Sequence, residues 1–161
     1  MARTKSEPRA AGGERVITVN RKAFHDYHIE QELEAGLVLR GTEIKSVREG
    51  RVNLRDAYAR IENGELWLIG AHISPYEHSG AYFNHEPDRP RKLLVHRREL
   101  DVLRQALEAK GMTLVPLRLA LRKGRAKIDL GLARGKKLYD KRDALAERDA
   151  RRAVERALRE Q

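Results

Sequence analysis

Hydrophobic and polar residues alternate most regularly late in the chain, over residues 114–121 and 125–132. A period of two is typical of a strand that buries one face and exposes the other. The two stretches flank Lys123-Gly124 and therefore predict a hairpin. The inward face of this hairpin is predicted to hold Leu117, Leu119, Leu121, Ile128, Leu130 and Leu132.

A second hairpin is predicted in the middle of the chain. Asn63-Gly64 is the strongest short-range signal for a two-residue turn between antiparallel strands. The strands on either side would be Tyr58–Ile61 and Leu66–Ile73. Trp67 falls in the second strand, and we expect its large ring to lie in the core.

Two further strands are predicted outside the hairpins. Tyr27–Leu39 interleaves aliphatic residues with glutamates, and Gly36 within it indicates a bulge or bend. Leu93–Val95 is a shorter apolar stretch. Residues 74–90, which contain three prolines and show no periodicity, are predicted to form a long loop, a feature that is often functional in a compact domain.

Three helices are predicted from caps and periodicity. Asn20 is suited to cap a short helix over 21–25, and Thr42 to cap another over 42–48. The clearest helix spans 97–110, where leucines form one apolar stripe and a glycine follows. Together, these elements predict a mainly β fold: a small closed antiparallel β-barrel of the oligonucleotide-binding type, with about three short helices outside it.

The two ends of the chain differ from the middle. Residues 1–21 carry a net charge of +3, residues 22–121 a net charge of zero, and residues 122–161 a net charge of +7. We expect a disordered extension over 1–16, a folded domain over 17–133 and a basic tail over 134–161 that is disordered alone and becomes helical on a partner. Basic ends around a neutral centre favour a polyanionic partner, although such tails can also serve solubility alone.

The sequence contains no pattern typical of an enzyme. There is no cysteine, the six histidines show no metal-ligand spacing, and no nucleophile-elbow or phosphate-loop motif occurs. We therefore expect no catalysis, no metal and no cofactor. No apolar run is long enough to span a membrane, and the first residues lack the apolar core of a secretion signal. We expect a cytoplasmic protein that does not bind membranes.

The residues best suited to a partner are basic pairs and loop aromatics. The pairs Arg21-Lys22, Arg91-Lys92, Arg97-Arg98 and Lys136-Lys137 could contact phosphates, which position a protein on RNA. Aromatic residues could stack on unpaired bases, the usual route to specific recognition of RNA. With a sequence pI of about 10.1, the chain has the electrostatic character of a nucleic-acid binder.

Six segments, in order along the chain, resemble the small protein B family. They are NRKAFHDY (20–27), LEAG (33–36), GTEIKSVREG (41–50), RKLLVHRREL (91–100), GLARGKK (131–137) and YDKRD (139–143). The resemblance implies binding to the tRNA-like domain of transfer-messenger RNA, also called SsrA RNA. It further implies delivery of that RNA, with elongation factor Tu bound to the charged RNA, to ribosomes stalled on truncated messages. This process is trans-translation, and we expect the protein to act in it as a monomer.

The resemblance also assigns roles to individual residues. The RNA-binding set would be Asn20, Arg21, Lys22, Glu34, Arg91, Lys92, Leu94 and His96. The set in the ribosomal decoding centre and empty messenger channel would be Lys136, Lys137, Tyr139, Asp140, Lys141 and Arg142. Glu34 would accept hydrogen bonds from base edges or orient a nearby arginine. The chain departs from the family pattern at His96, Tyr139 and Ala146.

Two other functions remain open from the sequence. A general RNA-binding translation factor or ribosomal protein of the same fold would bind many RNAs with similar affinity and a steep dependence on salt. A small hydrolase or metalloenzyme would require a pocket with convergent titratable groups, which the sequence does not indicate.

Overall fold

The computed structural model describes residues 13–80, 83–136 and 138–159, with the backbone alone over 138–144. Strands predominate in its body, as the sequence predicted. The elements in chain order are β1 (Glu14–Val19), α1 (Arg21–Asp26), β2 (Tyr27–Leu37), α2 (Gly41–Arg48), β3 (Val52–Asn53), β4 (Tyr58–Glu62), β5 (Glu65–Ile69), β6 (His72–Ile73), β7 (Arg91–Leu94), α3 (Arg97–Leu107), β8 (Met112–Arg122), β9 (Arg125–Gly135) and α4 (Leu138–Arg159).

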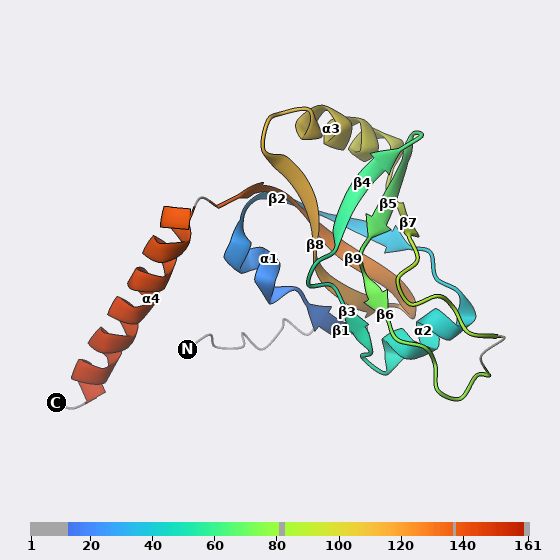
Figure 1. The fold of residues 1–161 in the computed structure, drawn as a ribbon, viewed down its shortest axis with the longest axis horizontal. Helices are drawn as coiled ribbons and strands as arrows, with labels where there is room; N and C mark the ends of the chain where they lie inside the picture. The colour runs from blue at the N-terminus through green and yellow to red at the C-terminus, as the bar shows by residue number, and fades with distance from the viewer. Residues whose placement is uncertain (1–12, 81–82, 137, 160–161) are drawn as a thin grey trace.

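The strand pairings form a continuous circuit. Neighbours run in the order β8, β4, β5, β7, β2 and β9, and β9 pairs again with β8. All these pairings are antiparallel, and β1 is added outside the circuit on β8. The short strands β3 and β6 form a separate two-stranded ladder. Figure 1 shows the strands wrapping around one interior, with α2 and α3 at opposite ends.

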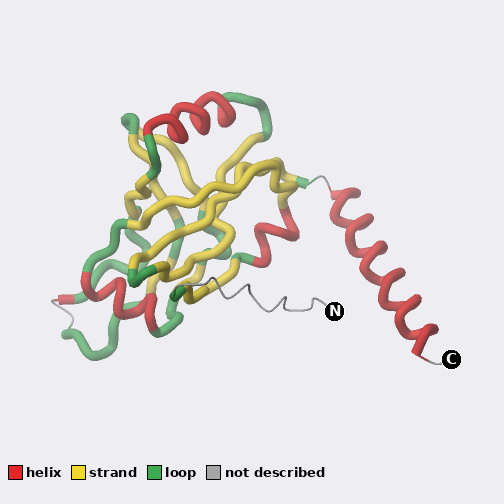
Figure 2. The backbone as a smooth tube through the Cα atoms, turned by 180° about the vertical axis from the view of Figure 1, so that it is seen from behind, coloured by secondary structure: helices red, strands yellow, loops and turns green. Residues whose placement is uncertain are grey.

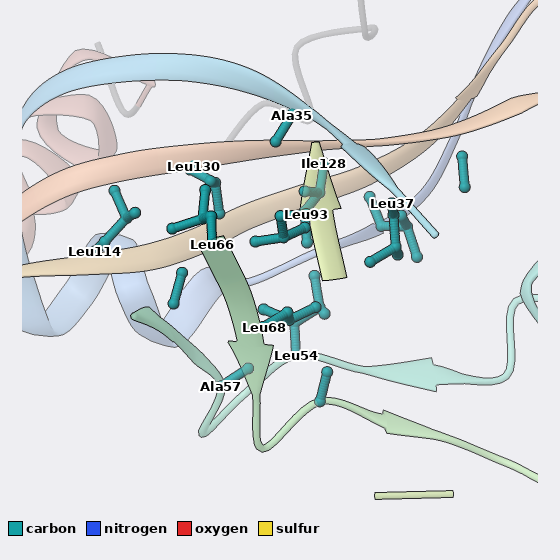
Figure 3. Close-up of a cluster of buried hydrophobic side chains, with 14 of the residues drawn as sticks. Ala35, Leu37, Leu54, Ala57, Leu66, Leu68, Leu93, Leu114, Ile128 and Leu130 are labelled. Carbon is teal, nitrogen blue, oxygen red and sulfur yellow. The ribbon is translucent and has the colours of Figure 1, made fainter. Parts of the chain in front are cut away.

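The main core lies inside this circuit. Figure 3 shows side chains such as Leu66, Leu93 and Leu130 from different strands, and Leu54 from the segment between β3 and β4, converging on one cluster. Val47 of α2 and Leu103 of α3 belong to the same cluster, so the two helices close its ends. Each fully buried leucine stabilises the fold by roughly 1.5–3 kcal/mol relative to an exposed one.

A second, smaller cluster lies on the other face of β8 and β9. It consists of Ala23 from α1 with Val115, Leu117 and Ala133. The middle of β8 is therefore buried on both faces, and the predicted division into one apolar and one polar face is wrong there. The cause is a bulge: the register shifts between Pro116 and Arg118, so Leu117 leaves the face that carries Leu119.

Both predicted two-residue turns are confirmed. Asn63 and Gly64 have φ values of 52° and 73°, and Lys123 and Gly124 have φ values of 51° and 75°. Two successive positive φ angles are the mark of the type I′ turn, whose twist matches that of the strands it joins.

The predicted strand Leu66–Ile73 is interrupted at Gly70. Gly70 has a φ of 79°, and a Cβ atom there would lie 3.1 Å from the carbonyl oxygen of Asp56. Any other residue would be strained and crowded at this position. The chain therefore leaves β5 after Ile69 and begins the separate strand β6 at His72.

Two local predictions differ from the structure. Strand β1 extends into the predicted disordered segment as far as Glu14, because β8 supplies an edge with which it pairs. The bulge in β2 lies between Ile29 and Gln31, whereas Gly36 pairs regularly with both neighbouring strands. Residues 1–12 of the predicted extension lie outside the described residues.

The start of α2 was also predicted wrongly. Its N-cap is Arg40, whose backbone N–H donates to Glu43 Oε1 over 2.9 Å. Thr42 is the second residue of the helix, and its hydroxyl is 2.9 Å from His85 Nδ1. A carboxylate from the first turn thus replaces the predicted hydroxyl cap.

The basic tail contains one long helix, α4. Figures 1 and 2 show it extending away from the sheet, and the side chains of 145–159 are all exposed. Within α4, Arg151 Nη2 lies 3.3 Å from Glu147 Oε1, an i,i+4 ion pair. Strand β9 ends at Gly135, two residues beyond the predicted end of the folded domain.

Candidate nucleic-acid interface

Asn20 supports the first helix from inside the protein. It is 4% exposed, and its Nδ2 donates to the carbonyl oxygens of Leu54 at 3.0 Å and Pro116 at 2.9 Å. Its Oδ1 accepts from the backbone N–H of Ala23, as the sequence predicted for the cap. Both polar atoms of its side chain are therefore engaged within the protein, and its contact with RNA stays a prediction. The residue fixes where α1 begins.

Arg21 and Lys22 follow this cap and are exposed on α1. Lys22 Nζ lies 2.7 Å from Asp56 Oδ1, and this hydrogen bond holds the pKa of Asp56 below its ordinary value. Since both side chains are exposed, the ion pair is weak and a phosphate can replace the carboxylate. The predicted phosphate contacts of the first motif are therefore accessible.

Arg91, in contrast, is fully buried at the start of β7. Its Nε donates to Glu43 Oε2 over 2.5 Å, and its Nη1 donates to the carbonyl oxygen of Ala71 over 2.7 Å. Its Nη2 donates to the carbonyl oxygen of Pro87 over 2.9 Å. The side chain has no exposed surface. Within the protein the side chain joins β7, α2 and the 74–90 loop, and its contact with RNA stays a prediction.

Glu43 is the buried anion of this cluster. It also accepts hydrogen bonds from the Arg89 guanidinium and from the Arg40 backbone. Burial by itself would raise the pKa of the Glu43 carboxyl, but the hydrogen bonds that it accepts outweigh burial and hold that pKa below its ordinary value. The side chain is therefore ionised at neutral pH and keeps both arginines in place.

The neighbours of Arg91 along β7 alternate between the two faces. Lys92 and Leu94 point outward, while Arg91 and Leu93 are buried. Lys92 Nζ lies 3.2 Å from Glu65 Oε1, and Leu94 is 53% exposed. His96 caps α3 through its extended backbone and is exposed. These three predicted RNA residues share one accessible region of the surface.

Glu34 is held by an arginine of a distant strand. Its Oε2 accepts from Arg122 Nη1 over 2.6 Å, and the same guanidinium contacts Asp129 and Glu14. The hydrogen bonds that Arg122 donates to the Asp129 carboxylate are the main cause that raises the pKa of Arg122 above its ordinary value. Glu34 was predicted either to accept hydrogen bonds from base edges or to orient a nearby arginine. Its hydrogen bond from Arg122 fits the second role.

The predicted RNA residues form two groups at opposite ends of β2. Helix α1 leads directly into β2 at Tyr27, whereas β7 pairs with β2 at Gly36 and Leu37. The Lys22 side chain also reaches Asp56, whose carbonyl oxygen lies beside Gly70 just after the end of β5 (Figure 1).

The predicted decoding-centre residues lie where β9 leads into α4. The backbone N–H of Lys136 donates to the carbonyl oxygen of Asp26 over 2.9 Å, which anchors the start of the tail beside α1. Lys137 lies outside the described residues. Tyr139, Asp140, Lys141 and Arg142 belong to the first turns of α4, where the backbone alone is described.

Comparison with known proteins decides the family. The model of the family "SmpB protein" matches residues 17–160, which include the strand circuit and nearly all of α4.

The chain belongs to the SmpB family.

Close relatives cover almost the whole chain. The SsrA-binding protein of Roseiflexus castenholzii is 63% identical over 152 residues, which are 94% of this chain and 96% of that protein. The SsrA-binding protein of Carboxydothermus hydrogenoformans is 62% identical over 146 residues, 91% of this chain and 97% of that protein. A solved SmpB structure described as "tmRNA-SmpB: a journey to the center of the bacterial ribosome" is 51% identical, with a TM-score of 0.64. It covers 76% of this chain and 85% of that one.

The histidines of this SmpB chain have ordinary partners. His25 Nδ1 lies 2.9 Å from Asp26, and His72 Nδ1 lies 2.7 Å from Asp88. His85 Nε2 lies 2.8 Å from the carbonyl oxygen of Ile73. Across residues 13–80, 83–136 and 138–159, no three histidine, aspartate or glutamate side chains gather where they could hold a metal ion. In the same ranges, no helix is both long and apolar enough to cross a membrane.

Three residues of the SmpB chain have a position that the sequence did not reveal. Arg122 gathers three carboxylates, Glu43 is a buried anion, and Trp67 is partly buried on the outward face of β5 and is not part of the core. The strict alternation of Leu66 and Leu68 around Trp67 was a signal that the ring faces outward. Arg122 and Glu43 gave no comparable signal, since most of their charged partners are 46 to 108 residues away in the chain.

Proposed function

We propose that this protein binds the tRNA-like domain of transfer-messenger RNA and delivers it to stalled ribosomes for trans-translation. The observation that carries this proposal is the family match over residues 17–160, which covers both the body and the tail. Relatives named SsrA-binding protein at more than 60% identity support the RNA partner. The likeness to an SmpB chain solved with transfer-messenger RNA and the ribosome supports both partners.

The body of the protein provides the RNA-binding surface. Its strand circuit acts as a closed barrel of the oligonucleotide-binding type, a fold whose sheet and loops commonly bind nucleic acid. Arg21 and Lys22 contact phosphates at one end of this surface, and Lys92, Leu94 and His96 contact RNA at the other. Asn20 and Arg91 contribute indirectly, because they hold α1 and β7 in place.

The tail acts on the ribosome. Lys136, Lys137, Tyr139, Asp140, Lys141 and Arg142 enter the decoding centre, and α4 occupies the empty messenger channel as a helix. All described side chains of α4 are exposed, which leaves the helix free for ribosomal RNA. The protein acts in the cytoplasm as a monomer and meets elongation factor Tu only through the charged RNA. It performs no catalysis of its own.

A competitive titration tests the RNA partner. A fluorescently labelled tRNA-like domain is titrated with the protein at a fixed salt concentration near 150 mM, against an unlabelled ordinary tRNA and an unlabelled hairpin of similar length. A strong preference for the tRNA-like domain supports the proposal. Equal affinity for all three RNAs would contradict it and would favour a general RNA-binding translation factor, whose phosphate contacts do not depend on RNA identity.

A further inference from the structure

The outer face of β4, β5 and β7 carries an aromatic ring between two cations. In β5, Leu66 and Leu68 point into the core, so Glu65, Trp67 and Ile69 point away from it. Trp67 lies directly opposite Arg60 of β4 on one side and Lys92 of β7 on the other. Side chains at opposite positions of antiparallel strands have Cβ atoms about 5 Å apart. The indole is thus flanked by a positive charge on each side.

Both cations are available to an anionic ligand. Arg60 Nη2 lies 3.1 Å from Glu62 Oε2, and Lys92 Nζ lies 3.2 Å from Glu65 Oε1. All four side chains are more than 40% exposed. Exposed ion pairs of this kind contribute little to stability, so phosphates can replace the carboxylates at little cost.

We propose that Trp67 stacks on an unpaired base of the bound RNA while Arg60 and Lys92 contact the adjacent phosphates. A flat aromatic ring on an open sheet face, with cations beside it, is the arrangement by which proteins bind single-stranded segments. An RNA ligand fits this face better than a protein does, because the two cations flank the ring on opposite strands. The face is also continuous with Leu94, the next outward residue after Lys92 on β7.

This inference rests on the proposed function and extends its surface from β7 across β5 to β4. It adds Trp67 and Arg60 to the RNA contacts and gives Lys92 a phosphate next to the stacked base. It also explains why an indole stands at an outward position of β5, where burial in the core cannot account for it.

Trp67 is the single tryptophan of the chain, so its fluorescence reports on this face alone. The full-length protein is titrated with the tRNA-like domain of transfer-messenger RNA while indole emission and its quenching by acrylamide are recorded. Stacking on a base is expected to quench the emission in proportion to bound RNA and to protect the indole from acrylamide. RNA binding is followed in parallel by anisotropy of the labelled RNA. Binding without any change at Trp67 overturns the inference and leaves the proposed function intact.

Variants separate stacking from mere proximity. Trp67→Leu is expected to weaken RNA binding roughly tenfold, the loss typical of one stacked base, without changing the slope of affinity against salt. Trp67→Phe, which keeps an aromatic face, is expected to retain most of the affinity. Arg60→Ala is expected to lower the salt slope by about one phosphate contact. Thermal unfolding of each variant shows that the fold is kept, and the wild-type fluorescence remains decisive if one variant does not fold.

The matched control is Tyr58→Leu. Tyr58 is an outward aromatic residue of the same face, opposite Ile69 and without a cation across from it. Its replacement is expected to leave RNA affinity unchanged. Equal losses in the Tyr58 and Trp67 variants would overturn the assignment to Trp67. Full affinity of Trp67→Leu for RNA, together with weaker binding to the ribosome, would also overturn it and would show that the face serves a different partner.

Discussion

Arg91 Nε lies 2.5 Å from Glu43 Oε2, and neither side chain has any exposed surface. This contact joins the first residue of β7 to the first turn of α2, 48 residues earlier in the chain. The same guanidinium fixes two carbonyl groups of the segment between β5 and β7. Because Arg91 is held inside, its neighbour Lys92 points outward. The position of the outward residues of β7 therefore depends on an ion pair that is buried within the protein.

The stability of this cluster depends on the charge of Glu43. Glu43→Gln removes the charge at nearly constant volume and leaves the buried guanidinium of Arg91 without its anion. Removing one partner of a buried ion pair costs about 3–5 kcal/mol. We therefore expect the free energy of unfolding to fall by about this amount at pH 7, measured by urea denaturation.

The loss of stability in Glu43→Gln should depend on pH in a definite direction. Because the pKa of Glu43 is lowered in the folded protein, its charge stabilises the fold fully above the ordinary carboxyl pKa of about 4.3. This contribution is lost as the pH falls through the lowered pKa of the folded state. The difference in stability between the wild type and Glu43→Gln should therefore be largest at neutral pH and shrink below about pH 4. A difference that stayed constant down to pH 3 would contradict an ionised Glu43.

Arg91 and Lys92 are adjacent cations with different predicted effects on RNA binding. Lys92→Ala should lower the slope of log affinity against log salt by about 0.7–0.9, the value for one lost phosphate contact. Arg91→Gln should reduce stability and leave that slope unchanged, because the guanidinium never reaches the RNA. Affinity is measured between 50 and 300 mM salt, below the unfolding temperature of each variant. Equal reductions of the slope in both variants would show that Arg91 becomes exposed when RNA binds.

The parts of the fold that could be predicted from the sequence are those with local causes. The turn at Asn63-Gly64 follows from two residues that tolerate positive φ, and the cap at Asn20 follows from one side chain and the helix after it. Alternation placed Ile128 and Leu130 in the core, because a regular strand keeps its two faces separate. In each case, the physical cause lies within a few residues of the feature.

The remaining features depend on contacts between distant segments. One extra residue in β8 moved Leu117 to the opposite face, and no residue in its neighbourhood signals that bulge. The basic pair Arg91-Lys92 looks uniform in sequence, yet one member is buried because Glu43 lies opposite it. The candidate RNA residues were therefore found in the sequence as motifs. Only the structure showed which of them are exposed and can contact RNA, and which are buried and support the fold.

Asn20 tests whether a buried residue of these motifs acts by supporting the fold. Asn20→Ala removes the donor to two buried carbonyl groups and the acceptor that caps α1. Leaving buried polar groups unsatisfied costs about 1–3 kcal/mol, so we expect a loss of roughly 2–3 kcal/mol in the free energy of unfolding. RNA affinity per folded molecule should keep its wild-type salt slope. The matched control is Arg21→Ala, which should lower the salt slope and leave stability nearly unchanged.

The boundary between the body and the tail can be tested by two truncations. Removal of 137–161 leaves β9 and the hydrogen bond from Lys136 to Asp26 complete. We expect this variant to unfold at the wild-type urea concentration, to bind the isolated tRNA-like domain and to fail in peptide tagging on stalled ribosomes. Removal of 134–161 also deletes the pairing of Arg134 and Gly135 with the start of β2.

The longer truncation should therefore lose stability as well as tagging. The strand pairing of Arg134 and Gly135 and the hydrogen bond of Lys136 to Asp26 disappear in it, and each hydrogen bond contributes about 0.5–1.5 kcal/mol. A free energy of unfolding that is roughly 2 kcal/mol lower in the longer truncation than in the shorter one would place the end of the folded body at Lys136. If the variant that lacks 137–161 supported tagging at the wild-type rate, a function for α4 would be contradicted. If that variant were unfolded, α4 would be shown to support the sheet.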